Sequence, residues 1–237
     1  MVAKIEEDIL GVNMANKFSA IKTSIKFING RVIKEYRIKT ISPHYKSVIS
    51  KFIFEYYNSL ISSGIPVPKL LEHEELRFVS IYHGKNIVEL AEDNIEEYYS
   101  SNNHIFNDVL NIIKIAKDNN IYFDPHIKNF TIYDNKVWYV DIFPPYSEKY
   151  LEILLKSNPS QKEKIIENHN IFSPKMLPYH FLADFLATFD NEKVLKSLAK
   201  EMIKIGISDR LRMDIVRKIM EIDRSRKSPY NNKYDVV

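Results

Sequence analysis

The sequence predicts an α+β protein in which a small antiparallel sheet precedes a mainly helical region. Three observations support this class. The pair Asn29-Gly30 separates two stretches that alternate apolar and polar residues, which is the strongest short signal of a β-hairpin. Residues 45–63 carry apolar side chains at helical spacing, and further stretches with the same spacing follow residue 147.

The first part of the chain contains the expected sheet and one helix. The strands are short runs with alternating or apolar character bounded by turn residues, and we expect them over 19–28, 31–37, 66–72 and 76–83. The helix over 45–63 begins after Ser42-Pro43 and ends before Gly64.

The remainder is expected to be helical with one interrupting hairpin. A helix over 104–118 presents one apolar face, and the apolar run from Val137 to Asp141 contains the second strand of the hairpin. The later helices are separated by Pro, Gly or Asp-Asn breaks, and we expect them over 147–156, 160–168, 174–189, 191–205 and 209–225.

The strongest functional signal is the segment Asp124-Pro-His-Ile-Lys-Asn129, with Asp141 twelve residues after it. Phosphoryl transfer from ATP needs divalent metal to neutralise charge and a group that holds the acceptor hydroxyl in line. Asp124 can orient or deprotonate that hydroxyl, while Asn129 and Asp141 offer the hard oxygen ligands that Mg²⁺ or Mn²⁺ prefers. The alternative is structural: Asp-Pro starts a turn, Asn129 lies in it and Asp141 caps the segment after Pro144-Pro145.

With these residues in this order, the chain resembles the protein-kinase-like superfamily. The similarity is to its short members, namely aminoglycoside and choline-type phosphotransferases, lipopolysaccharide core kinases, RIO-type kinases and the archaeal tRNA kinase. Several of them also carry a His two residues after the catalytic Asp, as His126 does here. The resemblance implies that Asp124 is the catalytic Asp, Asn129 a metal ligand and Asp141 the main metal ligand.

The resemblance also implies a protein-kinase-like fold, with an N-terminal lobe over 1–83 and a helical C-terminal lobe over 84–237. In such a fold Lys34 would pair with the α- and β-phosphates of ATP, and Glu55 on the helix over 45–63 would hold Lys34 in place. Lys26 and Lys39 are rival lysines. The structural alternative is that Lys34 and Glu55 are solvated surface charges.

Two further parts of the nucleotide site are implied by the resemblance. The linker residues Ile81, Tyr82 and His83 would surround the base. The chain departs from the family pattern in having no glycine-rich loop, and Asn13 and Lys17 lie where that loop would cover the phosphates. The alternative is impaired nucleotide binding, which would make the protein a pseudokinase or a nucleotide-binding scaffold.

Composition narrows the setting in which the protein works. The 237 residues contain no cysteine, which excludes disulfides and thiolate metal sites. We expect a cytoplasmic protein without a membrane partner, because no apolar run is long enough to span a bilayer and no signal peptide is evident. Many Lys, Ile, Tyr and Glu residues with few glycines are typical of a thermophile.

The acceptor hydroxyl belongs to one of three classes: an RNA 2′-hydroxyl, a Ser or Thr of a protein, or a small molecule. Basic residues concentrate in the last helix and tail, at Arg210, Arg212, Arg217, Lys218, Arg224, Arg226, Lys227 and Lys233. We expect them to bind phosphates of an RNA, with tRNA as the candidate, which the kinase would modify with ATP. The alternatives are a solvated helix face paired with Asp214 and Glu221, and a helical RNA-binding protein in which the motif is incidental.

Overall fold

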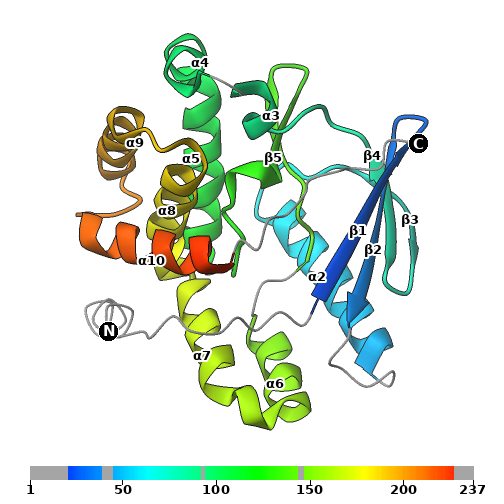
Figure 1. Ribbon diagram of the computed structural model, residues 1–237. Coiled ribbons are helices and arrows are strands. Elements are labelled where there is room, and N and C mark those ends of the chain that lie inside the picture. The colour runs from blue at the N-terminus through cyan, green and yellow to red at the C-terminus, as the bar shows by residue number, and fades with distance from the viewer. Residues whose placement is uncertain (1–20, 39–44, 92–93, 144–146, 227–237) are drawn as a thin grey trace.

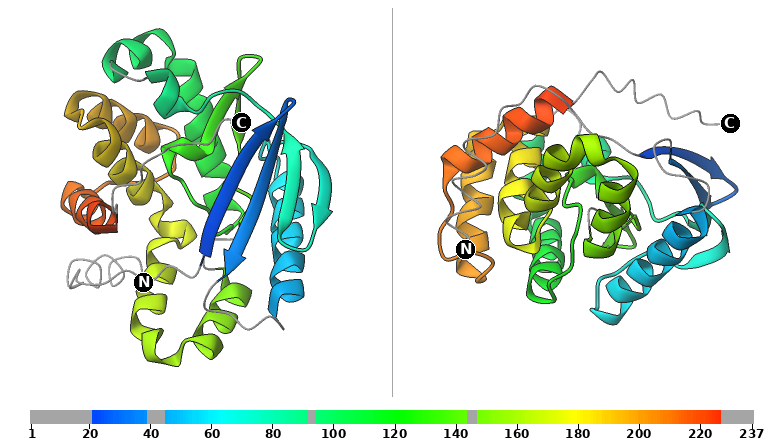
Figure 2. Two further views of the ribbon diagram at one scale, coloured as in Figure 1. Left: turned by 45° about the vertical axis from the view of Figure 1, so that its right-hand side comes forward. Right: turned by 90° about the horizontal axis from the view of Figure 1, so that it is seen from below.

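Two antiparallel sheets of unequal size organise the described residues, which are 21–38, 45–91, 94–143 and 147–226 of the computed structural model. The larger sheet lies with helix α2 (Lys46–Ser62) on one side of the molecule, and the other helices lie on the opposite side (Figure 1). Both further views keep this separation (Figure 2). The predicted α+β class, with a small antiparallel sheet before a mainly helical part, is therefore confirmed.

The larger sheet has four strands in the order β1-β2-β4-β3, and every neighbouring pair is antiparallel. Its strands are β1 (Ile21–Ile28), β2 (Arg31–Ile38), β3 (Leu70–Glu74) and β4 (Arg77–Ile81). The predicted hairpin turn at Asn29-Gly30 is confirmed, with φ of 50° and 71° at the two positions, as a tight hairpin with two left-handed residues requires. The strand expected over 66–72 begins only at Leu70, because Pro66 and Pro68 have no N–H to give to a ladder.

Helix α2 covers one face of this sheet. Its inward residues include Ile49, Ile53 and Leu60, which are fully buried, and they join the same core as Phe78 of β4. Ser50 fixes the helix to the sheet through a 2.8 Å contact between its hydroxyl and the Nε2 atom of His73. The helix predicted over 45–63 is confirmed.

The helical part is built around α8 (Leu177–Phe189), which packs against α5, α9 and α10. Residues 177–186 of α8 are all buried, as expected of a helix that is enclosed on every side. The other α-helices are α3 (Ile87–Ala91), α4 (Ile95–Ser101), α5 (Asn103–Asp118), α6 (Glu148–Ser157), α7 (Lys162–Ile171), α9 (Glu192–Lys204) and α10 (Met213–Arg226). Short 3₁₀ turns cover η2 (Ile127–Asn129), η3 (Pro159–Gln161) and η4 (Pro174–Met176).

A second, two-stranded sheet connects the two parts. It consists of β5 (Phe130–Tyr133) and β6 (Lys136–Tyr139), the hairpin expected after Asn129. The backbone N–H of Tyr139 donates to the carbonyl of Pro66 at 2.8 Å, and that of Ile132 donates to the carbonyl of Lys85 at 3.0 Å. These two hydrogen bonds place the hairpin between the four-stranded sheet and the helices.

Among the helices of the described ranges, none has the length and apolar character needed to cross a membrane. The positions Asn13 and Lys17, expected to cover the phosphates, lie outside the described residues, as does the tail from residue 227 onward. Side chains are described in α10 only up to Glu221, so Arg224 and Arg226 are not placed.

Candidate functional site

A cleft of about 600 Å³ lies between the four-stranded sheet and the β5–β6 hairpin. Its volume falls in the range of small-molecule binding sites. The residues of the expected site that line it are Lys34, Ile81, Tyr82, His83, Asp124, Asn129 and Asp141. They come from β2, the end of β4 and the segment after it, the loop before β5 and the segment after β6, so the fold brings together residues that are far apart in the sequence.

The loop from Asp124 to Asn129 is held by its own side chains. The Oδ1 atom of Asp124 accepts a 3.2 Å hydrogen bond from the backbone N–H of His126, which closes the turn that Asp-Pro begins. The Nδ2 atom of Asn129 donates to the carbonyl of Asp124 at 3.2 Å, and Asn129 is itself buried. The turn that begins at Asp124-Pro125 therefore belongs to the same loop that carries the expected catalytic residue Asp124 and the expected metal ligand Asn129.

Tyr139 of β6 holds this loop through two hydrogen bonds to the backbone of Asp124. Its hydroxyl accepts from the backbone N–H of Asp124 at 3.3 Å and donates to the carbonyl of Asp124 at 3.2 Å. The side chain is fully buried and stacks on Phe123 with 4.0 Å between ring centroids. Sequence reasoning missed this role, because a Tyr in the apolar run from Val137 to Asp141 has the pattern of an ordinary core residue.

Asp184 of α8 supports the other end of the loop. Its Oδ2 atom accepts a 2.8 Å hydrogen bond from the backbone N–H of Ile127, and the residue is 3% exposed. A buried carboxylate is costly without such a donor. The sequence signal that could have identified Asp184 is the presence of one acidic residue inside the apolar stretch 177–186.

Two carboxylates and one ammonium group share the floor of the cleft. Burial raises the pKa of Asp141; the charge of Lys34 opposes this effect and the charge of Asp124 adds to it. Burial also raises the pKa of Asp124, but the charge and hydrogen bond of His126 outweigh it and hold that pKa below its ordinary value. Burial lowers the pKa of Lys34, against the opposing charge of Asp141. The cleft thus holds acidic and basic groups within electrostatic reach of one another.

Lys34 is positioned by the opposite wall of the cleft. Its Nζ atom donates to the backbone carbonyl of Val140 at 2.5 Å. The backbone N–H of Val140 in turn donates to the carbonyl of Asn129 at 2.9 Å, while the Oδ1 atom of Asp141 accepts from the N–H of Phe143 at 3.1 Å. Hydrogen bonds along this wall therefore fix Lys34 and both expected metal ligands.

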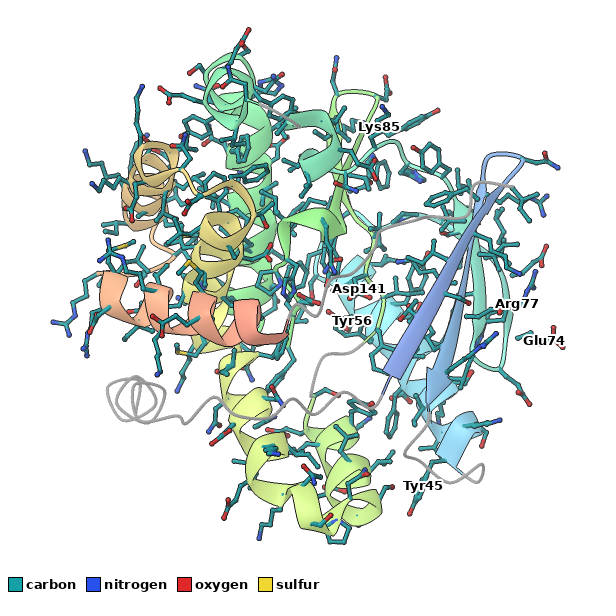
Figure 3. The ribbon with its side chains drawn as sticks, viewed as in Figure 1. Tyr45, Tyr56, Glu74, Arg77, Lys85 and Asp141 are labelled. Carbon is teal, nitrogen blue, oxygen red and sulfur yellow. The ribbon has the colours of Figure 1, made fainter. Side chains whose placement is uncertain are left out.

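The expected pairing of Lys34 with Glu55 is not formed between these two described residues. The carboxylate of Glu55 instead lies 3.1 Å from the Nζ atom of Lys149 and 3.9 Å from that of Lys51. The reason is the phase of α2, which turns the neighbouring Tyr56 inward and leaves the Glu55 side chain 42% exposed. Figure 3 shows Tyr56 and Asp141 between the sheet and the helices. Burial raises the pKa of Tyr56, and the charge of Asp141 raises it further.

The linker after β4 forms one end of the cleft. The Nδ1 atom of His83 lies 3.0 Å from the carbonyl oxygen of Ile81, and the backbone N–H of Tyr82 donates to the carbonyl of Gly30 at 2.9 Å. The ring of His83 packs at 4.2 Å from that of Trp138 on β6. Ile81 and Tyr82 are partly exposed at the rim, whereas His83 is buried. These contacts fix the conformation of the linker.

Gly84 is needed where the linker meets the hairpin, a requirement that sequence reasoning missed. Its φ is +75°, and a Cβ at this position would lie 1.9 Å from the carbonyl oxygen of Ile132. A left-handed conformation and so close a backbone approach both favour glycine.

The donor set fits a magnesium-type ion. Within the described ranges, no three His, Asp or Glu side chains come together as a metal site on their own. Mg²⁺ commonly binds through one or two protein oxygens together with water and phosphate oxygens. Asn129 uses its Nδ2 atom to bind the loop, which leaves its amide oxygen available, and Asp141 lines the same cleft. Asn129 and Asp141 therefore have the oxygen atoms that would be needed to hold such an ion.

The basic residues of the last helix are partly paired. The guanidinium of Arg212 lies 2.6 Å from the carboxylate of Asp214, and that of Arg217 lies 3.1 Å from the carboxylate of Glu192. Arg212, which directly precedes α10, thus has the expected partner Asp214, whereas Arg217 pairs with Glu192 of α9 and not with Asp214 or Glu221 of its own helix.

No model of a known protein family matches the chain, and no curated protein matches its sequence.

Proposed function

We propose that this protein is an ATP-dependent phosphotransferase with a protein-kinase-like fold. The observation that carries the proposal is that Lys34, Asp124, Asn129 and Asp141 line one cleft of about 600 Å³ together with the linker after β4. A cleft of this volume in which several polar and charged groups converge is the first place to expect an active site.

The arrangement of elements supports the same proposal. A small antiparallel sheet carries Lys34 on β2, the helix α2 comes next, and the chain then enters a helical part whose hairpin holds Asn129 and Asp141 at its two ends. This is the order that the resemblance to the protein-kinase-like superfamily implies.

In the proposed reaction, the γ-phosphoryl group leaves the β-phosphate of ATP and is transferred to an acceptor hydroxyl. The bond from γ-phosphorus to the bridging oxygen breaks, and a bond to the acceptor oxygen forms. Asp124 orients the hydroxyl and accepts its proton, while Lys34 binds the α- and β-phosphates. Asn129 and Asp141 hold Mg²⁺ or Mn²⁺, which when bound neutralises phosphate charge. The base lies against Ile81, Tyr82 and His83.

For the acceptor we propose an RNA, with tRNA as the first candidate, ahead of a protein Ser or Thr or a small molecule. Lys85 lies just after the linker, and Lys128 lies in the loop beside Asn129; both are exposed and both line the cleft. Positive charge beside the proposed transfer site suits a polyanionic acceptor better than a cationic small molecule. Figure 3 shows Lys85 near the β5–β6 hairpin.

The test is transfer of label from γ-labelled ATP, with Mg²⁺ and separately with Mn²⁺, into pools of tRNA, cellular protein and small metabolites. Asp124→Ala serves as the inactive variant and Glu55→Gln as the matched control, because Glu55 is paired on the surface. Label in tRNA that Asp124→Ala abolishes and Glu55→Gln preserves supports the full proposal. Label in another pool reassigns the acceptor. No label in any pool from a folded protein overturns the enzymatic proposal and favours a pseudokinase or scaffold.

A further inference from the structure

We propose that His126 is a positioning residue that holds one oxygen of Asp124 and so presents the other oxygen to the acceptor hydroxyl. The inference rests on the proposed function for its catalytic consequence. Its structural content concerns only how the Asp124 carboxylate is fixed.

His126 supplies two donors to a single oxygen. The Oδ1 atom of Asp124 accepts from the backbone N–H of His126 at 3.2 Å and also from the Nδ1 atom of the His126 ring in a close hydrogen bond. Within the described part of the chain, Oδ2 of Asp124 has no hydrogen-bond partner. Oδ1 is therefore committed to the loop, while Oδ2 is the oxygen available to a ligand in the cleft.

The ring of His126 is itself held in orientation. Its Nε2 atom lies 3.8 Å from Oδ1 of Asp184, an ion-pair distance, while Oδ2 of Asp184 holds the backbone N–H of Ile127 at 2.8 Å. The ring also packs edge to face against His180 at 4.9 Å. The imidazole thus lies between two carboxylates, with Nδ1 toward Asp124 and Nε2 toward Asp184. Nδ1 has an acceptor at hydrogen-bond distance, as a donating ring nitrogen requires, and the Asp184 carboxylate lies at longer range beside Nε2.

This contact matters because the two oxygens of a carboxylate exchange places by rotation about one bond. A general base must present one oxygen within hydrogen-bond reach of the proton that it accepts. A misplacement of about 1 Å can cost about 100-fold in rate. The backbone donor of residue 126 remains after any substitution except Pro, so removing the ring tests the ring alone.

The experiment compares wild type, His126→Ala and His126→Asn. Steady-state kinetics measure transfer from ATP to one acceptor, and crystal structures show the orientation of the Asp124 carboxylate. In the Asn variant the amide nitrogen occupies nearly the position of Nδ1 and can donate to the same oxygen. We expect His126→Ala to lower kcat roughly 10- to 100-fold with an unchanged KM for ATP, and His126→Asn to restore most of that loss. His104→Ala, an exposed histidine on α5, is the control with no expected effect.

The crystal structures give a readout that does not depend on transfer. We expect the Asp124 carboxylate to rotate in His126→Ala and to keep its wild-type orientation in His126→Asn. An unchanged carboxylate in His126→Ala, or full activity of that variant, overturns the inference. If wild type transfers label to no pool while the carboxylate still rotates in His126→Ala, the proposed function fails and the positioning contact stands.

Discussion

The two walls of the cleft are built in different ways. On the hairpin side, Asp124 and Asn129 are fixed by hydrogen bonds from the same loop, and Tyr139 and Asp184 hold that loop from β6 and α8. On the sheet side, Lys34 is the member of the expected site that β2 contributes, and its hydrogen bond runs to the opposite wall at Val140. Most of the hydrogen bonds that fix the site residues therefore lie on the hairpin side. This side also binds the ammonium group of Lys34, which comes from the sheet.

The largest expected effect comes from the hairpin wall. Asp141→Asn removes the charge that would bind metal, and we expect metal-dependent turnover to fall by about 1,000-fold or more, because several kcal/mol of charge stabilisation are lost. Calorimetric titration with ATP, with and without Mg²⁺, measures the accompanying loss of metal-dependent binding. If metal-dependent ATP affinity survives in Asp141→Asn, the assignment of Asp141 as the main ligand is wrong.

Tyr139→Phe probes the same wall by removing one hydroxyl from it. The backbone N–H and carbonyl of Asp124 lose that partner, so we expect unfolding free energy to fall by about 1–3 kcal/mol. We also expect kcat to fall roughly 10-fold, because Asp124 is less well positioned. Denaturant unfolding and steady-state kinetics check the two effects. Tyr133→Phe, on the exposed end of the hairpin, is the control.

Gly84→Ala tests the junction between the walls. A Cβ there meets the carbonyl of Ile132 in addition to the strain of a positive φ, whereas Gly64, with φ of +83°, has no atom within 4 Å of an added Cβ. We expect Gly84→Ala to lose about 1–3 kcal/mol more unfolding free energy than Gly64→Ala. Paired thermal or denaturant unfolding measures the difference. Equal losses would mean that the linker moves aside without cost.

Glu55→Gln should have the smallest effect. The carboxylate is paired with Lys149 and Lys51 on the surface, and exposed pairs contribute about 0–1 kcal/mol. We therefore expect kcat and the KM for ATP to change less than about twofold. A large rise in KM for ATP would show that α2 rotates in the working state to bring Glu55 to Lys34, and that the sheet wall is ordered by its own helix after all.

Sequence reasoning identified the parts of the site whose signals are local. The turn of Asp124-Pro125 and the hairpin at Asn29-Gly30 depend on residues next to one another, and the structure forms both. The inward face of α2 was harder to assign, because a shift of one residue turns a helix by about 100° and exchanges Glu55 for Tyr56. The prediction of the helix is confirmed, whereas the expected pair between Glu55 and Lys34 is not formed, because Glu55 contacts Lys51 and Lys149 instead.

The remaining parts depend on contacts between distant segments. Tyr139 and Asp184 act on backbone groups of the loop from β6 and α8, and their roles arise from the packing of those elements. For such positions, one amino-acid sequence shows the residue type and its spacing from other residues, but it does not show which backbone group the side chain contacts. Asp184 could be suspected from its apolar surroundings in the sequence, whereas Tyr139 could not be separated from the core.

The contact between His83 and Trp138 has a practical consequence. Trp138 is the only tryptophan among the 237 residues, and its ring lies 4.2 Å from a residue that lines the linker end of the cleft. Indole fluorescence depends on its immediate surroundings, so the protein carries one natural fluorophore at the place where the base is proposed to bind. Unlabelled nucleotides can therefore be screened by emission alone, and their ranking obtained before any acceptor has been identified.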